Sequence, residues 1–334
     1  MTARLAAGLT AVLGLLVAIG LIAHQGFEPI LDLLSRIRWG VLWIALFHLV
    51  ALTLLAQAWR SLLVSRWPGS IATFLRARWV RDGVNDLLPV AQIGGQLVGA
   101  RMLTLEGATA VVAVAGAVAD MTVELLAQLL FTLIGLGLLL QSASHDRAAH
   151  WIVIGVAVAV PALAGFVLAQ RWGLFKLVEI MLERLAETST RVSVGRVTVL
   201  HDTIGAIYRD HRGLFSSTVC HLLAWLLGAG EAWFALHLMG SPAGLREAVI
   251  LESLGQAIRS AAFVVPAGLG VQEGGYMLLG GMLGLGPEVA LAASLVRRAR
   301  DLVLGLPALL FWQVAEGRLL WLAFGRPRKP GDRC

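Results

Sequence analysis

Charged side chains occur inside stretches of this sequence that are otherwise apolar. Asp120 and Glu124 lie four residues apart in the run from Ala108 to Leu140, so a helix would place both on one face. A charge at the centre of a membrane span costs about 2.5–3.5 kcal/mol even on a lenient scale, so such groups must face a cavity or one another. We therefore expect at least one of the two carboxyl groups to be protonated or paired with a cation.

A second group of charges lies in the run from Val289 to Phe311, and others lie near two proline- and glycine-rich breaks. We expect the arginines of this group to attract the polar or anionic head group of a lipid: Arg101, Arg259, Arg297, Arg298 and Arg300. The acids are expected to pair with arginines of the other half of the chain, or to carry coupling protons: Asp120, Glu124, Glu273 and Asp301. The alternative is a purely structural network of ion pairs.

The composition places these charges in a membrane protein. Of the 334 residues, 58% are hydrophobic and 14% are charged, and the mean hydropathy is +0.79, which excludes a soluble enzyme. The net charge of +6 is typical of cytoplasmic loops beside anionic lipid, so we expect no nucleic-acid partner. The two cysteines, Cys220 and Cys334, are too few for a disulfide framework or a four-cysteine metal site.

Apolar runs long enough to cross a bilayer recur along the chain. The predicted fold is an all-α polytopic membrane protein with about six full spans and two interrupted stretches, Leu75–Leu105 and Ala248–Leu285. The six spans are about Leu5–Ala23, Val41–Ala58, Ala108–Leu140, Trp151–Ala169, Leu214–Met239 and Val289–Phe311.

Lysine and arginine residues predict the orientation, because cytoplasmic loops carry an excess of them. Eighteen of the 27 lie at the N-terminus, in residues 59–81 and 170–213, and in the tail from Arg318, whereas the opposite connections hold four. Both termini are therefore expected in the cytoplasm. The remaining five are the arginines assigned above to the head group.

The two interrupted stretches share a pattern of two apolar residues, a proline and then glycines. Proline cannot donate to a helix ladder and glycine permits a sharp turn, so we expect two re-entrant hairpins. The expected hinge positions are Pro89, Gly94, Gly95, Pro266, Gly268, Gly270 and Gly274. Each hairpin stands between two spans, and the charge count inverts the second unit relative to the first. Inverted repeats with broken helices are typical of transporters with a site near the midplane; two ordinary kinked helices are the alternative.

The whole chain, residues 1–334, is expected to form a single integral membrane domain. Its expected parts are a first repeat half at 39–140, a cytoplasmic surface helix or linker at 170–213, a second, inverted half at 214–313 and a basic cytoplasmic tail at 316–334. The sequence holds no phosphate-binding G-K-[ST] loop, no H-E-x-x-H metal motif and no G-x-S-x-G nucleophile elbow. We therefore expect no cofactor, no metal and no catalytic activity.

Two segments, Leu88–Gln96 continuing to Arg101 and Pro266–Gly274, resemble the lysylphosphatidylglycerol synthase transmembrane, or flippase-like, family. The last span, with Arg297-Arg298-x-Arg300-Asp301, looks most like the branch associated with hopanoid biosynthesis. The resemblance covers about residues 5–315 and implies a polytopic bacterial inner-membrane protein that moves or presents lipids. In the bifunctional members a soluble synthase domain follows, and because this chain stops at Cys334, aminoacyl transfer is not expected.

The leading hypothesis is thus a lipid translocase for hopanoid or related lipids, working by alternating access of two inverted halves. Its partners would be hopanoid or anionic membrane lipids, together with enzymes of lipid biosynthesis. The alternative is an intramembrane enzyme, or an assembly partner of one, that transfers a group to a polyprenoid or hopanoid lipid.

Overall fold

The computed structural model describes residues 15–17, 19–88, 94–142, 190–262, 265 and 268–324, and this part of the chain is helical without any strand. The predicted span Trp151–Ala169, most of the span Leu5–Ala23 and residues 170–189 of the predicted surface helix lie outside it. The helices are α2 (Phe27–Ile37), α3 (Gly40–Leu63), α4 (Ile71–Leu87), α5 (Gly94–Leu105), α6 (Ala110–Ser142), α8 (Thr190–Tyr208), α9 (His211–Leu238), α10 (Leu245–Ala261), α11 (Val271–Met282) and α12 (Pro287–Phe324).

Three of the described helices, α3, α6 and α9, are long and apolar enough to cross a membrane. They coincide with the predicted spans Val41–Ala58, Ala108–Leu140 and Leu214–Met239. The predicted span Val289–Phe311 lies within α12, which has 38 residues and overlaps the beginning of the predicted tail. Residues 24–38, interpreted from sequence as a connection, instead contain α2, which follows a left-handed Gly26 (φ 88°) and packs against α12.

Each interrupted stretch consists of two short helices packed on each other, and the two hairpins have equal helix lengths. Helices α4 and α10 have 17 residues each, and α5 and α11 have 12 each. Leu88 leaves α4 in an extended conformation, as a residue before proline prefers. Pro89 and Pro266 themselves lie outside the described residues.

The predicted hinge glycines differ in conformation. Gly268 and Gly270 have φ of 61° and 76°, in the left-handed region that favours glycine. Gly95 instead permits a close approach, because a β-carbon there would lie 2.3 Å from the carbonyl oxygen of Arg81. Its amide nitrogen donates to Asn85 Oδ1 at 2.9 Å, which connects the start of α5 to the last turn of α4. Gly94 and Gly274 lie within α5 and α11.

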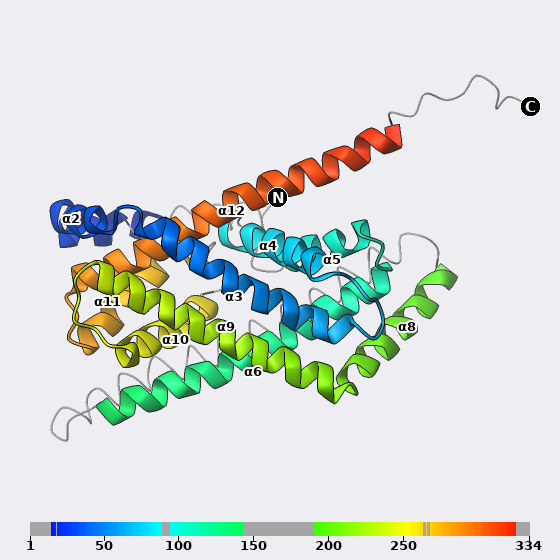
Figure 1. Cartoon of the computed structure of the whole chain (residues 1–334), viewed down its shortest axis with the longest axis horizontal. Coiled ribbons are helices and arrows are strands. Elements are labelled where there is room, and N and C mark those ends of the chain that lie inside the picture. Colours follow the sequence, from blue (N-terminus) through cyan, green and yellow to red (C-terminus); the bar gives the residue numbers. More distant parts are fainter. Residues whose placement is uncertain are drawn as a thin grey trace, which may run out of the picture.

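The helices form two sets with the same order, a first set of α3–α6 and a second set of α9–α12 (Figure 1). Each contact between consecutive helices of the first set has a counterpart in the second. The contacts between the sets are also reciprocal, because the last helix of each set packs on the second helix of the other: α12 on α4, and α6 on α10. Helices α3 and α9 lie antiparallel. Gly40 at the start of α3 lies against Leu238 at the end of α9, and Ser61 near the end of α3 is 3.0 Å from Ser216 near the start of α9, between hydroxyl oxygens.

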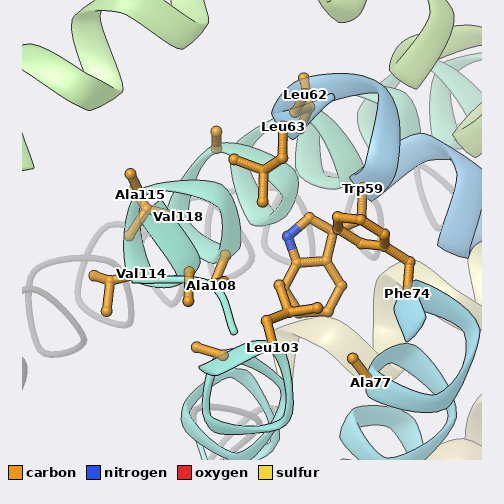
Figure 2. Close-up of a cluster of buried hydrophobic side chains, with 14 of the residues drawn as sticks. Trp59, Leu62, Leu63, Phe74, Ala77, Leu103, Ala108, Val114, Ala115 and Val118 are labelled. Atoms are coloured by element: carbon orange, nitrogen blue, oxygen red, sulfur yellow. The ribbon is translucent and has the colours of Figure 1, made fainter. Parts of the chain in front are cut away.

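Buried apolar side chains form two clusters, each centred on one set of helices. Figure 2 shows Trp59 of α3 beside Phe74 of α4 and Leu103 of α5, with alanine and valine side chains of α6 near them. The Trp59 and Phe74 rings meet edge to face with centroids 6.0 Å apart. A second cluster joins α9, α10, α11 and α12 around Leu251 and Val296, and it includes Ile44 of α3 and Leu139 of α6. Burial of each large side chain contributes about 1.5–3 kcal/mol, so the apolar clusters also hold the two sets together.

Candidate functional site

A cavity of about 180 Å³ lies between the two sets of helices. Helices α3, α4, α5, α6, α9, α10 and α12 all contribute to its wall. Five arginines and four carboxylates line it, and they come from α4, α6, α10 and α12. Such charges are tolerated inside a membrane protein where they face one another or a wet cavity, so this is the part of the described chain in which polar chemistry is concentrated.

On the side of the first set, Arg78 and Arg81 of α4 bind both acids of α6. Arg81 lies 2.5 Å from Asp120 and 2.5 Å from Glu124, and Arg78 lies 2.6 Å from Glu124, measured between nitrogen and oxygen. The guanidinium carbon of Arg81 is also 5.5 Å from the centroid of the Trp59 ring. The pairing of the two acids with cations is therefore confirmed. The cations themselves were missed, because Arg78 and Arg81 were counted with the cytoplasmic loop at 59–81.

A signal for these two arginines was present in the sequence. Arg78 and Arg81 are three residues apart, so a helix places them on one face, as it does Asp120 and Glu124. The two arginines lie between the apolar residues Phe74 and Val84, where a charged pair on one helix face stands out. This helical spacing indicates the location of the two arginines better than their closeness to the basic loop does.

On the side of the second set, the polarity of the contact is reversed. Glu252 of α10 binds Arg297 of α12 and accepts a hydrogen bond from Tyr276 at 2.8 Å. Glu252 and Arg78 occupy the same position counted from the first residues of their helices, Leu245 and Ile71. In the first set, the hairpin supplies the arginine and the long helix α6 supplies the acid. In the second set, the hairpin supplies the acid and the long helix α12 supplies the arginine.

Two further predicted residues meet at the start of α11. Glu273 accepts a hydrogen bond from the amide of Gly270 at 2.7 Å and binds Arg298 of α12. This arrangement closes the first turn of α11 on the left-handed Gly270 and fixes it to α12. Neither charged residue lines the cavity.

Arg300 and Arg101 have different surroundings. Arg300 binds Asp301 beside it and Glu231 of α9, and it lines the cavity. Arg101 is 54% exposed and binds Glu316 at 3.1 Å on the outside of the bundle. The structure thus brings Arg259, Arg297 and Arg300 to the cavity and leaves Arg101 away from it.

Pairing of acids in one half with arginines in the other was expected and is mostly wrong. Among the described residues it occurs between Arg259 of α10 and Asp86 of α4, and at the surface between Arg101 and Glu316. The other arginine–carboxylate pairs lie within a set, because each hairpin is held against the long helix that follows it.

Two histidines also connect the sets. His221 Nε2 of α9 lies 3.1 Å from Asp120 of α6, and His48 Nδ1 of α3 lies 2.8 Å from Glu231 of α9. No periodicity in the sequence could indicate their partners, which are distant in the chain.

Three carboxylates are the most exposed charged side chains of the cavity wall. Among the lining carboxylates, the side chains of Asp86, Asp82 and Glu124 are 29%, 25% and 20% exposed, whereas the lining arginines are between 2% and 13% exposed. Carboxylate oxygens therefore face the cavity with guanidinium groups behind them. Such a wall accepts hydrogen bonds more readily than it donates them. Within the described chain, no group of three or more His, Cys, Asp or Glu could hold a metal ion.

Comparison with known proteins decides the family. A family model described as the lysylphosphatidylglycerol synthase TM region matches residues 7–308. The chain belongs to this family. No curated protein and no solved structure matches it. As a member of the lysylphosphatidylglycerol synthase TM family, the chain is a membrane protein involved in lipid modification or transport. The family name refers to a synthase, but this sequence contains none of the catalytic motifs considered above.

Proposed function

We propose that this chain is a lipid translocase of the inner membrane, acting on hopanoid or related lipids by alternating access of two inverted sets of helices. The observation that carries the proposal is the charged cavity between two sets with the same helix order and matched packing. The antiparallel arrangement of α3 and α9 supports an inverted relation between the sets. Discontinuous helices on either side of a midplane site are typical of transporters with inverted repeats.

The size of the cavity favours a head group as its occupant. Pockets that enclose a drug-sized molecule have volumes of about 300–1,000 Å³, and this cavity is smaller, at about 180 Å³. The apolar part of a lipid would remain in the bilayer, against the exposed apolar side chains of α3, α6 and α9. Only the polar group, which is costly to move through hydrocarbon, requires the protein.

The chemistry of the wall favours a head group that carries hydroxyl or amine donors. Asp82, Asp86 and Glu124 offer carboxylate oxygens to it, and the arginines behind them hold these oxygens in place. A bare anion would meet acidic oxygens first.

A head-group accessibility assay in proteoliposomes tests the proposal. A fluorescent lipid with a polyol head group is placed in both leaflets, and a membrane-impermeant reagent modifies the outer leaflet. We expect the parent chain to deliver inner-leaflet lipid to the reagent and Glu252→Gln to slow this about tenfold, because Arg297 then loses its charged partner. Glu106→Gln is the control, since Glu106 pairs with Arg76 at the surface. Equal rates in liposomes with all three proteins, or with no protein, would exclude translocation through the cavity.

The same cavity in an intramembrane enzyme would have a different consequence. Deletion of an enzyme removes a lipid species from total extracts, whereas deletion of a translocase leaves the species and changes their distribution between leaflets. We expect unchanged species and altered distribution. A missing species would favour group transfer to a polyprenoid or hopanoid lipid instead.

A further inference from the structure

Three contacts between a carboxylate and a basic side chain, at or near the cavity, connect the first set of helices to the second. They join His221 to Asp120, His48 to Glu231, and Arg259 to Asp86. The side chains of Asp120 and Glu231 are 0% and 4% exposed, whereas Asp86 is 29% exposed. Asp86 is therefore the carboxylate among these contacts that water and protons can reach.

The contact between Asp86 and Arg259 joins the two broken hairpins near equivalent points. Asp86 lies in the last turn of α4 and Arg259 in the last turn of α10, each just before its break. The Arg259 Nη2 donates to Asp86 Oδ1 at 2.6 Å, and its Nη1 lies 3.8 Å from Asp301. Movement of one set against the other separates Asp86 from Arg259, whereas Asp301 moves with Arg259 in the second set.

The charged groups around Asp86 make its negative charge conditional on this contact. Asp82 lies one turn earlier on α4, and Asp301 and Arg300 face it from α12. Arg259 faces it from α10. His48 of α3 lines the cavity and also a smaller cavity of about 20 Å³, which Asp82, Asp86 and Asp301 line as well. Two neighbouring carboxylates favour protonation of Asp86 and the arginines oppose it, so a loss of Arg259 from its side shifts the balance toward the protonated form.

We propose that Asp86 is the proton-accepting residue that controls the contact between the two sets of helices. Deprotonated Asp86 holds Arg259 and keeps the sets together. A proton added to its carboxylate oxygen removes the ion pair, while Arg259 stays charged and keeps Asp301 as its counter-ion. This inference rests on the proposed translocase function and gives it a coupling ion.

Thiol labelling of the cavity tests the proposal without measuring transport. Ala51 of α3 lines the cavity and is buried, so a cysteine there reacts with a soluble maleimide only when the cavity opens. The experiment uses Ala51→Cys in a full chain with Cys220→Ser and Cys334→Ser, and each rate is divided by the rate for denatured protein at the same pH. We expect labelling to become at least fivefold faster as the pH falls from neutral to mildly acidic. With Asp86→Asn we expect fast labelling at every pH.

Asp82→Asn is the matched control. Asp82 is on the same helix, lines the same cavities and has similar exposure, but its partner is Arg78 on α4 itself. Its neutralisation leaves the contact between the sets intact but removes one carboxylate that favours protonation of Asp86, so we expect the pH response to be kept and to move to lower pH. Arg259→Gln breaks the same contact from the other side, and we expect pH-independent fast labelling as for Asp86→Asn.

Two outcomes would overturn the proposal. In the first, Asp86→Asn and Arg259→Gln keep the pH response of the parent. In the second, Asp82→Asn loses the pH response as completely as Asp86→Asn does. Thermal unfolding of each variant shows whether it is folded. If one of the two variants Asp86→Asn and Arg259→Gln does not fold, the other still tests the contact. A parent chain that shows the labelling pattern but moves no lipid would contradict the translocase and leave the role of Asp86 standing.

Discussion

Arg81 and Arg101 show at the residue scale why two arginines in apolar surroundings are not equivalent. Arg81 is buried and binds both Asp120 and Glu124, whereas Arg101 is half-exposed and binds Glu316 alone. Removing one member of a buried ion pair leaves an uncompensated charge, which costs about 3–5 kcal/mol. An exposed pair contributes about 0–1 kcal/mol.

Substitution of each arginine by methionine, which keeps most of the side-chain volume, tests this difference. We expect Arg81→Met to reduce the free energy of unfolding by about 3–5 kcal/mol, because Asp120 and Glu124 lose their closest cation. Arg101→Met should change it by less than about 1 kcal/mol. Thermal and denaturant unfolding in the same detergent measure both. Equal effects would mean that the cavity is wet enough to screen Arg81.

The sequence could indicate which residues carry unusual charge, but not all of their partners. Paired acids and the arginines of the last span are visible because they interrupt apolar runs. Asp86 and Arg78 are not, because they lie beside a polar loop and a loop explains them equally well. Their importance comes from contacts with α6 and α10, which are distant in the chain.

At the scale of elements, the packing of α4 against α12 positions both sides of the cavity. Gly83 of α4 faces Gly305 and Ala308 of α12, and a β-carbon on Gly83 would lie 3.2 Å from the Gly305 backbone and 2.9 Å from the Ala308 β-carbon. Trp79 also donates to the carbonyl oxygen of Leu304 at 2.8 Å. The two helices therefore approach too closely for a side chain at Gly83.

Gly83→Ala should therefore separate α4 from α12 and reduce the free energy of unfolding by about 1–3 kcal/mol, since overpacking at a rigid backbone contact is destabilising. Gly137→Ala in α6 is the control, because a β-carbon there meets nothing within 4 Å. It should be neutral or stabilise by up to about 1 kcal/mol. Unfolding of the two variants under identical conditions checks this. A neutral Gly83→Ala would contradict the close contact.

The start of α9 depends on Asp210. Its Oδ1 accepts a hydrogen bond from the amide of Gly213 at 3.0 Å, and Ser65 donates to its other oxygen at 3.1 Å. The bond from Gly213, followed by that from Ser65, lowers the pKa of Asp210 below its ordinary value. A depressed pKa in the folded state means that the carboxylate stabilises the protein above its unfolded pKa and loses this effect as the pH falls through the folded pKa.

Asp210→Ala should reduce the free energy of unfolding at neutral pH by about 1 kcal/mol, whereas Asp210→Asn keeps the cap and should lose less. The difference between parent and Asp210→Ala should shrink as the pH falls below the ordinary pKa of an aspartate. Unfolding of the three proteins across acidic pH measures it. A difference that grows on acidification would contradict the direction of the shift.

The elements were more predictable than their contacts. The two interrupted stretches coincide with the hairpins because proline and glycine act locally on the backbone. Helix α2 was missed because it is short and its polar residues resemble those of a loop. The extension of α12 to Phe324 was missed because Glu316 and Arg318 break the hydrophobic run without breaking the helix.

At the scale of the whole molecule, the two sets share a plan but differ in chemistry. Arg78 on one hairpin corresponds to Glu252 on the other, and each binds the long helix of its own set. Each set can therefore move with its ion pairs intact. Apolar packing between the sets is extensive, and among the described ionic contacts between them the pair of Asp86 with Arg259 is the one at the cavity whose carboxylate is partly exposed.

An inverted relation between the sets makes a prediction about sidedness. The structure already places Ser65, after α3, within 3.1 Å of Asp210, before α9, so these two ends share a face. The excess of lysine and arginine predicts that this face is cytoplasmic. The connection before α10 should then face outward, and single cysteines at the exposed positions Val64, Val199 and Leu245 can report it.

In intact cells, a membrane-impermeant maleimide should label Leu245→Cys and leave Val64→Cys and Val199→Cys unlabelled until the membrane is opened. The pattern follows because α3 and α9 run in opposite directions, so the hairpins that follow them begin on opposite faces. Replacement of Cys220 and Cys334 removes background reaction. Labelling of Leu245→Cys only together with Val64→Cys would put both hairpins on one face, and two hairpins on one face cannot open the cavity alternately to the two sides.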